Sequence, residues 1–180
     1  MKSLKLFIAP IVISILYSPV IAVSEPLVDT DAHFHPVISD RGMVVSQEAI
    51  ASRVGADILA AGGNAIDAAV ATGFALAVTL PRAGNLGGGG FMLVYLAEQK
   101  KTIAIDYREM APSTAHRDMF LDKQGQVDNT KARNSAQSSG VPGTVAGLLH
   151  ALDKYGSMSL TEVIKPAIKL SQQDRKSTRL

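Results

Sequence analysis

Hydrophobic residues at every fourth position mark the first predicted helix. Ile50, Val54 and Ile58 would lie on one face of it, as an amphipathic helix requires. Ser46 is the residue expected to cap its N-terminus, and the glycine pair at 62–63 is expected to end it. The sequence therefore predicts an amphipathic helix between Ser46 and this glycine pair.

A second helix, from 65 to 80, is predicted to be apolar on nearly all sides. Asn64 followed by Asp67 resembles a capping box at its start, and Pro81 stops it. The stretch carries one charge and many small residues, so we expect it to be buried on most faces. Because such a helix needs covering layers, residues 23–173 are expected to fold poorly by themselves.

Two short apolar runs, Phe91 to Ala97 and Thr102 to Tyr107, follow a glycine-rich loop at 83–90. The polar residues between the runs favour an antiparallel hairpin. Residues 119–133 are polar and rich in turn formers, so they are predicted to be a surface excursion.

Two amphipathic helices are predicted in the last third of the chain, at 145–154 and 160–170. They would stand beside the hairpin without a regular alternation of strand and helix. This order favours a layered α+β fold over a Rossmann-like parallel sheet.

The two ends of the chain do not follow these patterns. Residues 1–22 combine Lys2 and Lys5, a short apolar run and a small residue at Ala22, which is typical of a cleavable signal peptide. Residues 23–42 are expected to be an extended leader. The basic residues 174–180 resemble an adapter-derived, non-native tail, so they are excluded from the fold.

Composition narrows the possible functions. The 180 residues are 47% hydrophobic and 19% charged, which excludes a disordered chain, and the absence of cysteine excludes thiol chemistry and cysteine-bound metals. The net charge of +2 becomes −2 between residues 23 and 173. No nucleic-acid partner is therefore expected.

Two motifs could bind a metal or a phosphate, but the first is interpreted as part of a solvated leader and the second as a site of close backbone approach. Asp31, His33 and His35 have a metal-site spacing, but His116 and His150 have no second ligand near them, so no metal is predicted. The glycines at 87–90 open a strand, whereas phosphate-binding glycine loops open a helix. No cofactor is expected.

Arg108 is the candidate binding residue. It follows the second strand of the hairpin, where a charged group on a rigid scaffold commonly meets a ligand. The planar guanidinium can grip a carboxylate with two hydrogen bonds. An ion pair with Asp106 or Glu109 is the structural alternative, and from the residues alone it is the favoured one.

Five separated stretches jointly resemble the γ-glutamyltransferase (γ-glutamyl transpeptidase, glutathione hydrolase) family, and its periplasmic bacterial members in particular. They keep the family's order and spacing, and they are MVVS at 43–46, GGNAIDAAVA at 62–71, AGNLGGGGFM at 83–92, IDYREMAP at 105–112 and SGVPGTVAGL at 139–148. We therefore interpret 43–173 as the N-terminal part of the large-subunit domain.

The resemblance implies an N-terminal nucleophile hydrolase fold, a four-layer αββα sandwich of which only part is present. It also implies a precursor that cleaves itself into a large and a small subunit. The new N-terminal Thr of the small subunit attacks the γ-glutamyl carbonyl, and water or an amine resolves the acyl-enzyme. That Thr motif is absent from this sequence, so the chain by itself is expected to be inactive.

One site residue of the family maps onto this chain. Arg108 matches the arginine that grips the α-carboxylate of the glutamyl group, and this favours the binding role over an ion pair. Expected partners are a γ-glutamyl substrate such as glutathione and the small subunit of the same precursor. The expected location is the periplasm, without a stable membrane anchor. The alternatives are a cephalosporin or glutaryl acylase of the same superfamily and a non-catalytic exported carboxylate-binding module.

Overall fold

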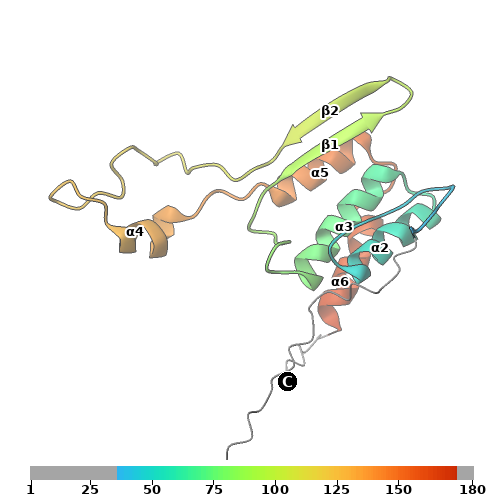
Figure 1. Ribbon diagram of the computed structural model, residues 1–180, viewed down its shortest axis with the longest axis horizontal. Coiled ribbons are helices and arrows are strands. Elements are labelled where there is room, and N and C mark those ends of the chain that lie inside the picture. Colours follow the sequence, from blue (N-terminus) through green and yellow to red (C-terminus); the bar gives the residue numbers. More distant parts are fainter. Residues whose placement is uncertain (1–35, 174–180) are drawn as a thin grey trace, which may run out of the picture. The chain divides into compact units, whose positions relative to one another are not determined.

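A computed structural model describes residues 36–173 (Figure 1). The predictions for the signal peptide, for the metal-like motif and for the tail fall outside these residues. The chain divides into Met1–Ile38 and Ser39–Leu180, and nearly all described residues belong to the second unit. No helix among residues 36–173 is both long enough and apolar enough to cross a bilayer.

The predicted first helix is α2, Ala49–Ala60. Its N-cap is Glu48, whose side chain accepts from the Ala51 N–H, so the prediction of Ser46 as the cap is wrong. The Ser46 hydroxyl instead lies 2.8 Å from the Ser52 hydroxyl and donates to the Glu48 carbonyl. Ser46 therefore fixes the segment that leads into the helix.

The second helix, α3 (Ala65–Thr79), begins with the predicted capping box of Asn64 and Asp67. It contacts α2, α5 (Thr144–Tyr155) and α6 (Leu160–Gln172), which together cover it. The middle of α3 is therefore buried, whereas Ala65 and Ala69 are exposed and Ile66, Leu76 and Val78 are only partly buried. The expectation that residues 23–173 fold poorly by themselves stays a prediction.

The hydrophobic core lies among these four helices. All thirteen residues of its buried cluster belong to them, with Val70, Ala71 and Ala75 of α3 fully buried near its centre. Helix α6 begins with a second capping box, formed by Ser159 and Glu162. Capped helix starts and small residues on α3 allow the close packing of this layer.

The hairpin has the predicted antiparallel pairing, with slightly different ends. Strand β1 is Phe91–Leu96 and β2 is Lys101–Asp106, in a register that pairs Phe91 with Asp106. The inner face of β1 includes the buried Val94, and β2 contacts α5. Figure 1 shows both strands running along α5.

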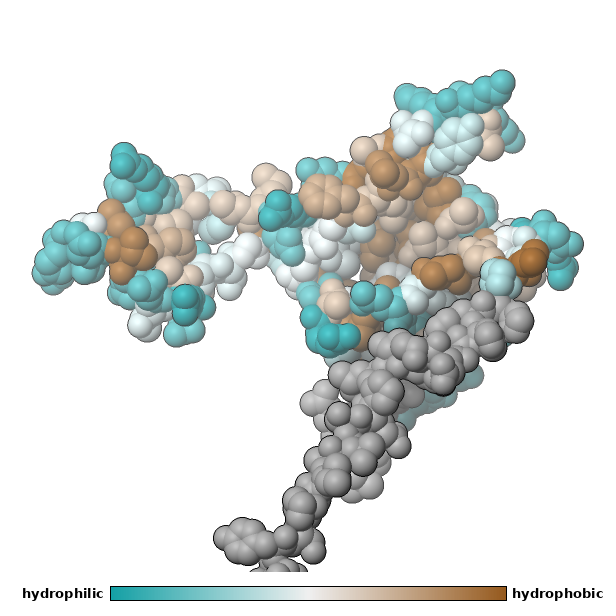
Figure 2. Space-filling model, viewed as in Figure 1, coloured by the Kyte–Doolittle hydropathy of each residue, from teal (hydrophilic) through white to brown (hydrophobic). Residues whose placement is uncertain are grey.

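The outer face of the hairpin is apolar but exposed. Phe91, Leu93 and Tyr95 are 66%, 76% and 64% exposed. Figure 2 shows hydrophobic residues along the hairpin and hydrophilic residues at its turn. One face of this two-stranded sheet is thus packed on a helix while the other is not.

The surface excursion between the hairpin and α5 contains helical turns that were not predicted. Helix α4 is Asn129–Asn134 and the 3-10 helix η1 is Ala136–Ser138. Asp128 caps α4 by accepting from the Thr130 and Lys131 N–H groups. No residue of either element is buried, so hydrophobic periodicity gave no signal for them.

The described residues thus combine helices with one antiparallel hairpin, which agrees with the predicted α+β class. The second sheet of a four-layer sandwich is not among them. The prediction of four layers goes beyond what this part of the chain contains.

Candidate functional site

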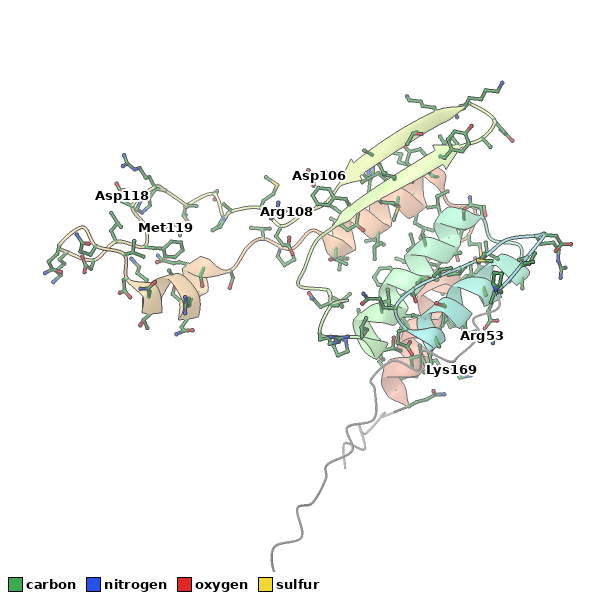
Figure 3. All side chains as sticks on the ribbon, viewed as in Figure 1. Arg53, Asp106, Arg108, Asp118, Met119 and Lys169 are labelled. Atoms are coloured by element: carbon green, nitrogen blue, oxygen red, sulfur yellow. The ribbon has the colours of Figure 1, made fainter. Side chains whose placement is uncertain are left out.

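The candidate site lies at the C-terminal end of β2. The ladder of the hairpin continues for one more pair, since the Tyr107 N–H donates to the Gly90 carbonyl (3.0 Å) and the Gly90 N–H donates to the Tyr107 carbonyl (3.3 Å). The Asp106 carboxylate then accepts from the Arg108 N–H (3.0 Å). Figure 3 shows Asp106 and Arg108 side by side where the chain leaves the hairpin.

The glycine-rich loop joins this strand end to helix α5. The Gly88 carbonyl accepts from the N–H groups of Gly143 and Thr144, at 2.9 and 3.0 Å. The Gly143 N-cap has no side chain to do this, so the loop carbonyl takes the place of a capping side chain. The carbonyl group of this loop thus serves to cap the start of α5.

A backbone bridge between Met110 and Val141 closes the other side of the site. The Met110 N–H donates to the Val141 carbonyl (3.2 Å), and the Val141 N–H donates back (2.8 Å). Arg108 therefore projects from a short segment whose backbone is hydrogen-bonded both before and after it.

Arg108 is exposed, and its guanidinium makes no ion pair with any residue in 36–173. The ion pairs in this range join Arg117 to Asp118 and Lys154 to Asp153. Asp106 meets the Arg108 backbone rather than its side chain, and Glu109 forms no ion pair with it. The structural alternative for Arg108 is thus not realised in the described residues.

A cavity of about 440 Å³ opens between the end of β2 and the first turns of α5. Tyr107, Arg108 and Met110 line it on one side, and Gly147 and His150 line it from α5. Its size is that of a small-molecule site, and most of its wall is apolar. Burial raises the pKa of Tyr107, so its phenol stays neutral over the physiological range.

His150 was not singled out as a member of this site. Its signal lies in the spacing along α5, because Gly143, Gly147 and His150 recur every three to four residues and share one helix face. This face lines the cavity because β2 packs against α5, and the sequence pattern does not predict that packing.

A second polar motif, around Asp67, forms a structural cluster. Asp67 is fully buried, and its carboxylate accepts from the Asn64 N–H (2.7 Å), the Ser157 hydroxyl (2.6 Å) and the Ser157 and Met158 N–H groups (2.9 and 3.2 Å). The Asn64 side chain also donates to the Tyr155 carbonyl (2.7 Å). This cluster fastens the start of α3 to the loop between α5 and α6.

The electrostatics of Asp67 agree with this structural role. Burial acts to raise the pKa of its carboxyl group, but the hydrogen bonds from Ser157, Asn64 and Met158 outweigh burial and hold the pKa below its ordinary value. The carboxylate therefore stays ionised and fully occupied by donors. Among residues 36–173 there is no group of three side chains that could hold a metal ion.

Comparison with known proteins places the chain in a family. The profile of the Gamma-glutamyltranspeptidase family matches residues 51–174. The Glutathione hydrolase proenzyme of Escherichia coli (strain K12) is 60% identical over 139 residues, which are 77% of this chain and 24% of the relative. The chain thus spans about a quarter of the length of the curated relatives it matches.

The chain can also be compared with a solved gamma-glutamyltranspeptidase structure and with an acylase, which represents the alternative family. The Helicobacter pylori gamma-glutamyltranspeptidase structure superposes with a TM-score of 0.71 at 50% identity, covering 75% of this chain and 39% of that one. The Acylase ACY 1 proenzyme of Pseudomonas sp. (strain V22) is 41% identical over 144 residues, which are 77% of this chain and 26% of the relative. The identity is lower for the acylase. Since the profile spans most of the chain and the fold agrees, the chain belongs to the gamma-glutamyltranspeptidase family.

Proposed function

We propose that this chain is the N-terminal part of the large subunit of a γ-glutamyltransferase that acts on γ-glutamyl compounds such as glutathione. We further propose that Arg108 binds the α-carboxylate of the glutamyl group. The observation that carries this proposal is an exposed guanidinium, without an ion pair in 36–173, on the wall of a 440 Å³ cavity at the end of a hydrogen-bonded strand.

The chemistry of the donor explains why an arginine suits this position. A γ-glutamyl group carries a free α-carboxylate, and a planar guanidinium can bind its two oxygens with two parallel hydrogen bonds. Such a contact would orient the γ-carbonyl for attack without taking part in bond making. Arg108 would thus contribute binding and orientation, which are worth a large part of the rate in well-placed reactions.

The bond-making groups are assigned to the part of the precursor that this chain does not match. There a Thr hydroxyl would attack the γ-carbonyl, the amine of the donor would leave, and water or an acceptor amine would release glutamate or form a new γ-glutamyl amide. The small subunit that begins with this Thr would be the partner of the present segment.

The hairpin supports the proposal that further layers cover this segment. Phe91, Leu93 and Tyr95 form an exposed apolar face, which monomeric proteins rarely leave in water. A second sheet from the same precursor would complete an αββα sandwich. We also propose export to the periplasm, on the strength of the signal-like sequence at 1–22.

The test uses the complete proenzyme, defined as residues 36–173 joined to the remainder of a full-length precursor from the parent gene or from the Escherichia coli relative. Arg108→Ala should lower kcat/KM for L-γ-glutamyl-p-nitroanilide by about 30-fold to several-thousand-fold, the equivalent of about 2–5 kcal/mol. Arg108→Lys keeps the charge but loses the fork, so its defect should be smaller.

Self-cleavage serves as the control in this experiment. The peptide bond that matures offers no free α-carboxylate, so both variants should still be processed into two subunits. If Arg108→Ala blocks processing while any processed enzyme keeps a normal kcat/KM, Arg108 has a structural role and the proposed site is wrong.

A further inference from the structure

We propose that Tyr107 is a positioning residue that holds Arg108 in its binding orientation. This inference rests on the proposed function and adds to it a residue that the binding chemistry does not itself identify. Tyr107 directly precedes Arg108, and its ring is half-buried between two glycine-containing segments.

The backbone of Tyr107 is the last paired position of the hairpin ladder. Its two hydrogen bonds to Gly90 fix the chain immediately before Arg108. The hydrogen bond from the Arg108 N–H to Asp106 then sets the direction in which the chain turns. Because the Arg108 side chain has no ion pair or hydrogen bond within 36–173, its backbone is what determines where the guanidinium can reach.

Glycines surround Tyr107 where any larger residue would collide with it. A Cβ atom on Gly90 would lie 3.0 Å from the ring, and one on Gly147 would overlap the ring base. A Cβ atom on Gly89 would lie 2.6 Å from the Tyr107 carbonyl oxygen, and one on Gly143 would overlap that oxygen. The glycine-rich loop and the start of α5 therefore form a slot matched to this one residue.

Tyr107 is also shared by two cavities. It lines the 440 Å³ cavity together with Arg108, and it lines a second cavity of about 370 Å³ next to α2 and α3. Tyr107 thus lies between the candidate site and the space beside α2 and α3. Removing its ring would leave the Arg108 segment without its lateral support.

The ring, rather than the hydroxyl, is the part that acts. Among residues 36–173 the Tyr107 hydroxyl has no hydrogen-bond partner. A Cβ atom on Gly90 would lie 3.0 Å from a ring carbon and 3.2 Å from the hydroxyl, and one on Gly147 would meet only carbon atoms of the side chain. A phenylalanine should therefore replace Tyr107 without loss, while an alanine should not. This contrast separates positioning by shape from any chemistry of the phenol.

The test is a double-mutant cycle in the complete proenzyme, with L-γ-glutamyl-p-nitroanilide as the donor. Tyr107→Ala should raise KM by about 10- to 100-fold with a smaller change in kcat, because a misplaced binding group weakens the hold on the donor. Tyr107→Phe should restore a KM close to that of the unchanged enzyme. In an Arg108→Ala background, Tyr107→Ala should have no further effect on KM.

A second variant covers the case in which the alanine enzyme does not mature. Tyr107→Leu keeps apolar volume in the slot, and it should give an intermediate rise in KM that again disappears in the Arg108→Ala background. An unchanged KM, or a rise that persists fully in that background, would overturn the role of Tyr107. A normal KM and kcat for Arg108→Ala alone would instead overturn the proposed function, so the two failures are distinguishable.

Discussion

The helical layer and the hairpin differ in how much of their apolar surface is buried within residues 36–173. The helices α2, α3, α5 and α6 contain the whole buried core cluster, and hydrogen bonds to Asp67 join α3 to the loop between α5 and α6. The hairpin contributes one buried hydrophobic residue, Val94, among those in 36–173, while its outer face remains apolar and exposed. The candidate site lies where these two regions meet.

Structural motifs and candidate binding motifs can therefore look alike in a sequence. The motif around Asp67 is polar, charged and embedded in small residues, yet every oxygen of its carboxylate is occupied by donors. Arg108 is equally charged but has no ion pair in the described part of the chain. Occupied polar groups hold a fold together, whereas unoccupied ones on a rigid frame are free to bind.

Asp67→Ala is expected to destabilise the helical layer more than any other change considered for these two regions. The change leaves buried donors on Asn64, Ser157 and Met158 without their acceptor, so the free energy of unfolding should fall by about 3–5 kcal/mol. Chemical denaturation of the complete proenzyme measures this. The matched control is Asp57→Ala on the exposed side of α2, which should change stability by less than about 0.5 kcal/mol. Equal effects at the two positions would refute the structural role of Asp67.

Unlike the helical layer, the hairpin should depend on the remainder of the precursor for the burial of its outer face. If the remainder of the precursor covers the outer face, Leu93→Ala should destabilise the complete proenzyme by about 2–5 kcal/mol, although Leu93 is 76% exposed in this segment. Glu98→Ala in the hairpin turn should be close to neutral. Thermal melts of the two variants make the comparison, and a neutral Leu93→Ala would mean that this face stays in water.

Two glycines of the glycine-rich loop, Gly87 and Gly89, test how tightly the slot around Tyr107 is packed. Gly89→Ala places a Cβ atom 2.6 Å from the Tyr107 carbonyl oxygen and the Glu109 nitrogen, so overpacking should cost about 1–3 kcal/mol. Gly87→Ala meets only the Asn85 side chain, at 3.6 Å, and should be tolerated. Denaturation midpoints of the two variants decide this, and equal midpoints would show that the slot around Tyr107 is not tight.

The smallest expected effect is on the pH dependence of stability at acidic pH. Because the folded-state pKa of Asp67 lies below its ordinary value of 3.8, the carboxylate stabilises the fold fully above that value, and this contribution is lost as the pH falls through the lower folded pKa. Unfolding measured between about pH 6 and pH 2 should therefore lose part of its acid dependence in Asp67→Asn. An unchanged acid dependence would contradict a lowered pKa for Asp67.

Local signals in the sequence were enough to predict the helices and the hairpin. The capping box of Asn64 and Asp67 spans three residues, so it could be read directly. The second half of the Asp67 cluster could not, because Ser157 lies 90 residues away. The cap of α2 was misassigned because Ser46 and Glu48 are both polar, and the contact between Ser46 and Ser52 decides between them.

The candidate site was predictable only where local sequence signals identify its residues. Arg108 could be named because it follows an apolar strand and lies in a family motif. The slot around Tyr107 and the position of His150 depend on α5 packing against β2, which no local pattern specifies. Helix α4 was missed because it buries nothing and so has no hydrophobic period.

The central claim is that Arg108 grips the α-carboxylate of the donor. A direct test compares two anilides that differ only in that carboxylate, γ-glutamyl and 4-aminobutyryl p-nitroanilide, as donors for the enzyme that the complete proenzyme yields after self-cleavage. The unchanged enzyme should strongly prefer the γ-glutamyl donor in kcat/KM. Arg108→Ala should lose most of that preference, because without the guanidinium the enzyme no longer makes the contact that distinguishes the two donors. If Arg108→Ala keeps the full preference for the γ-glutamyl donor, another group binds the carboxylate and the claim is contradicted.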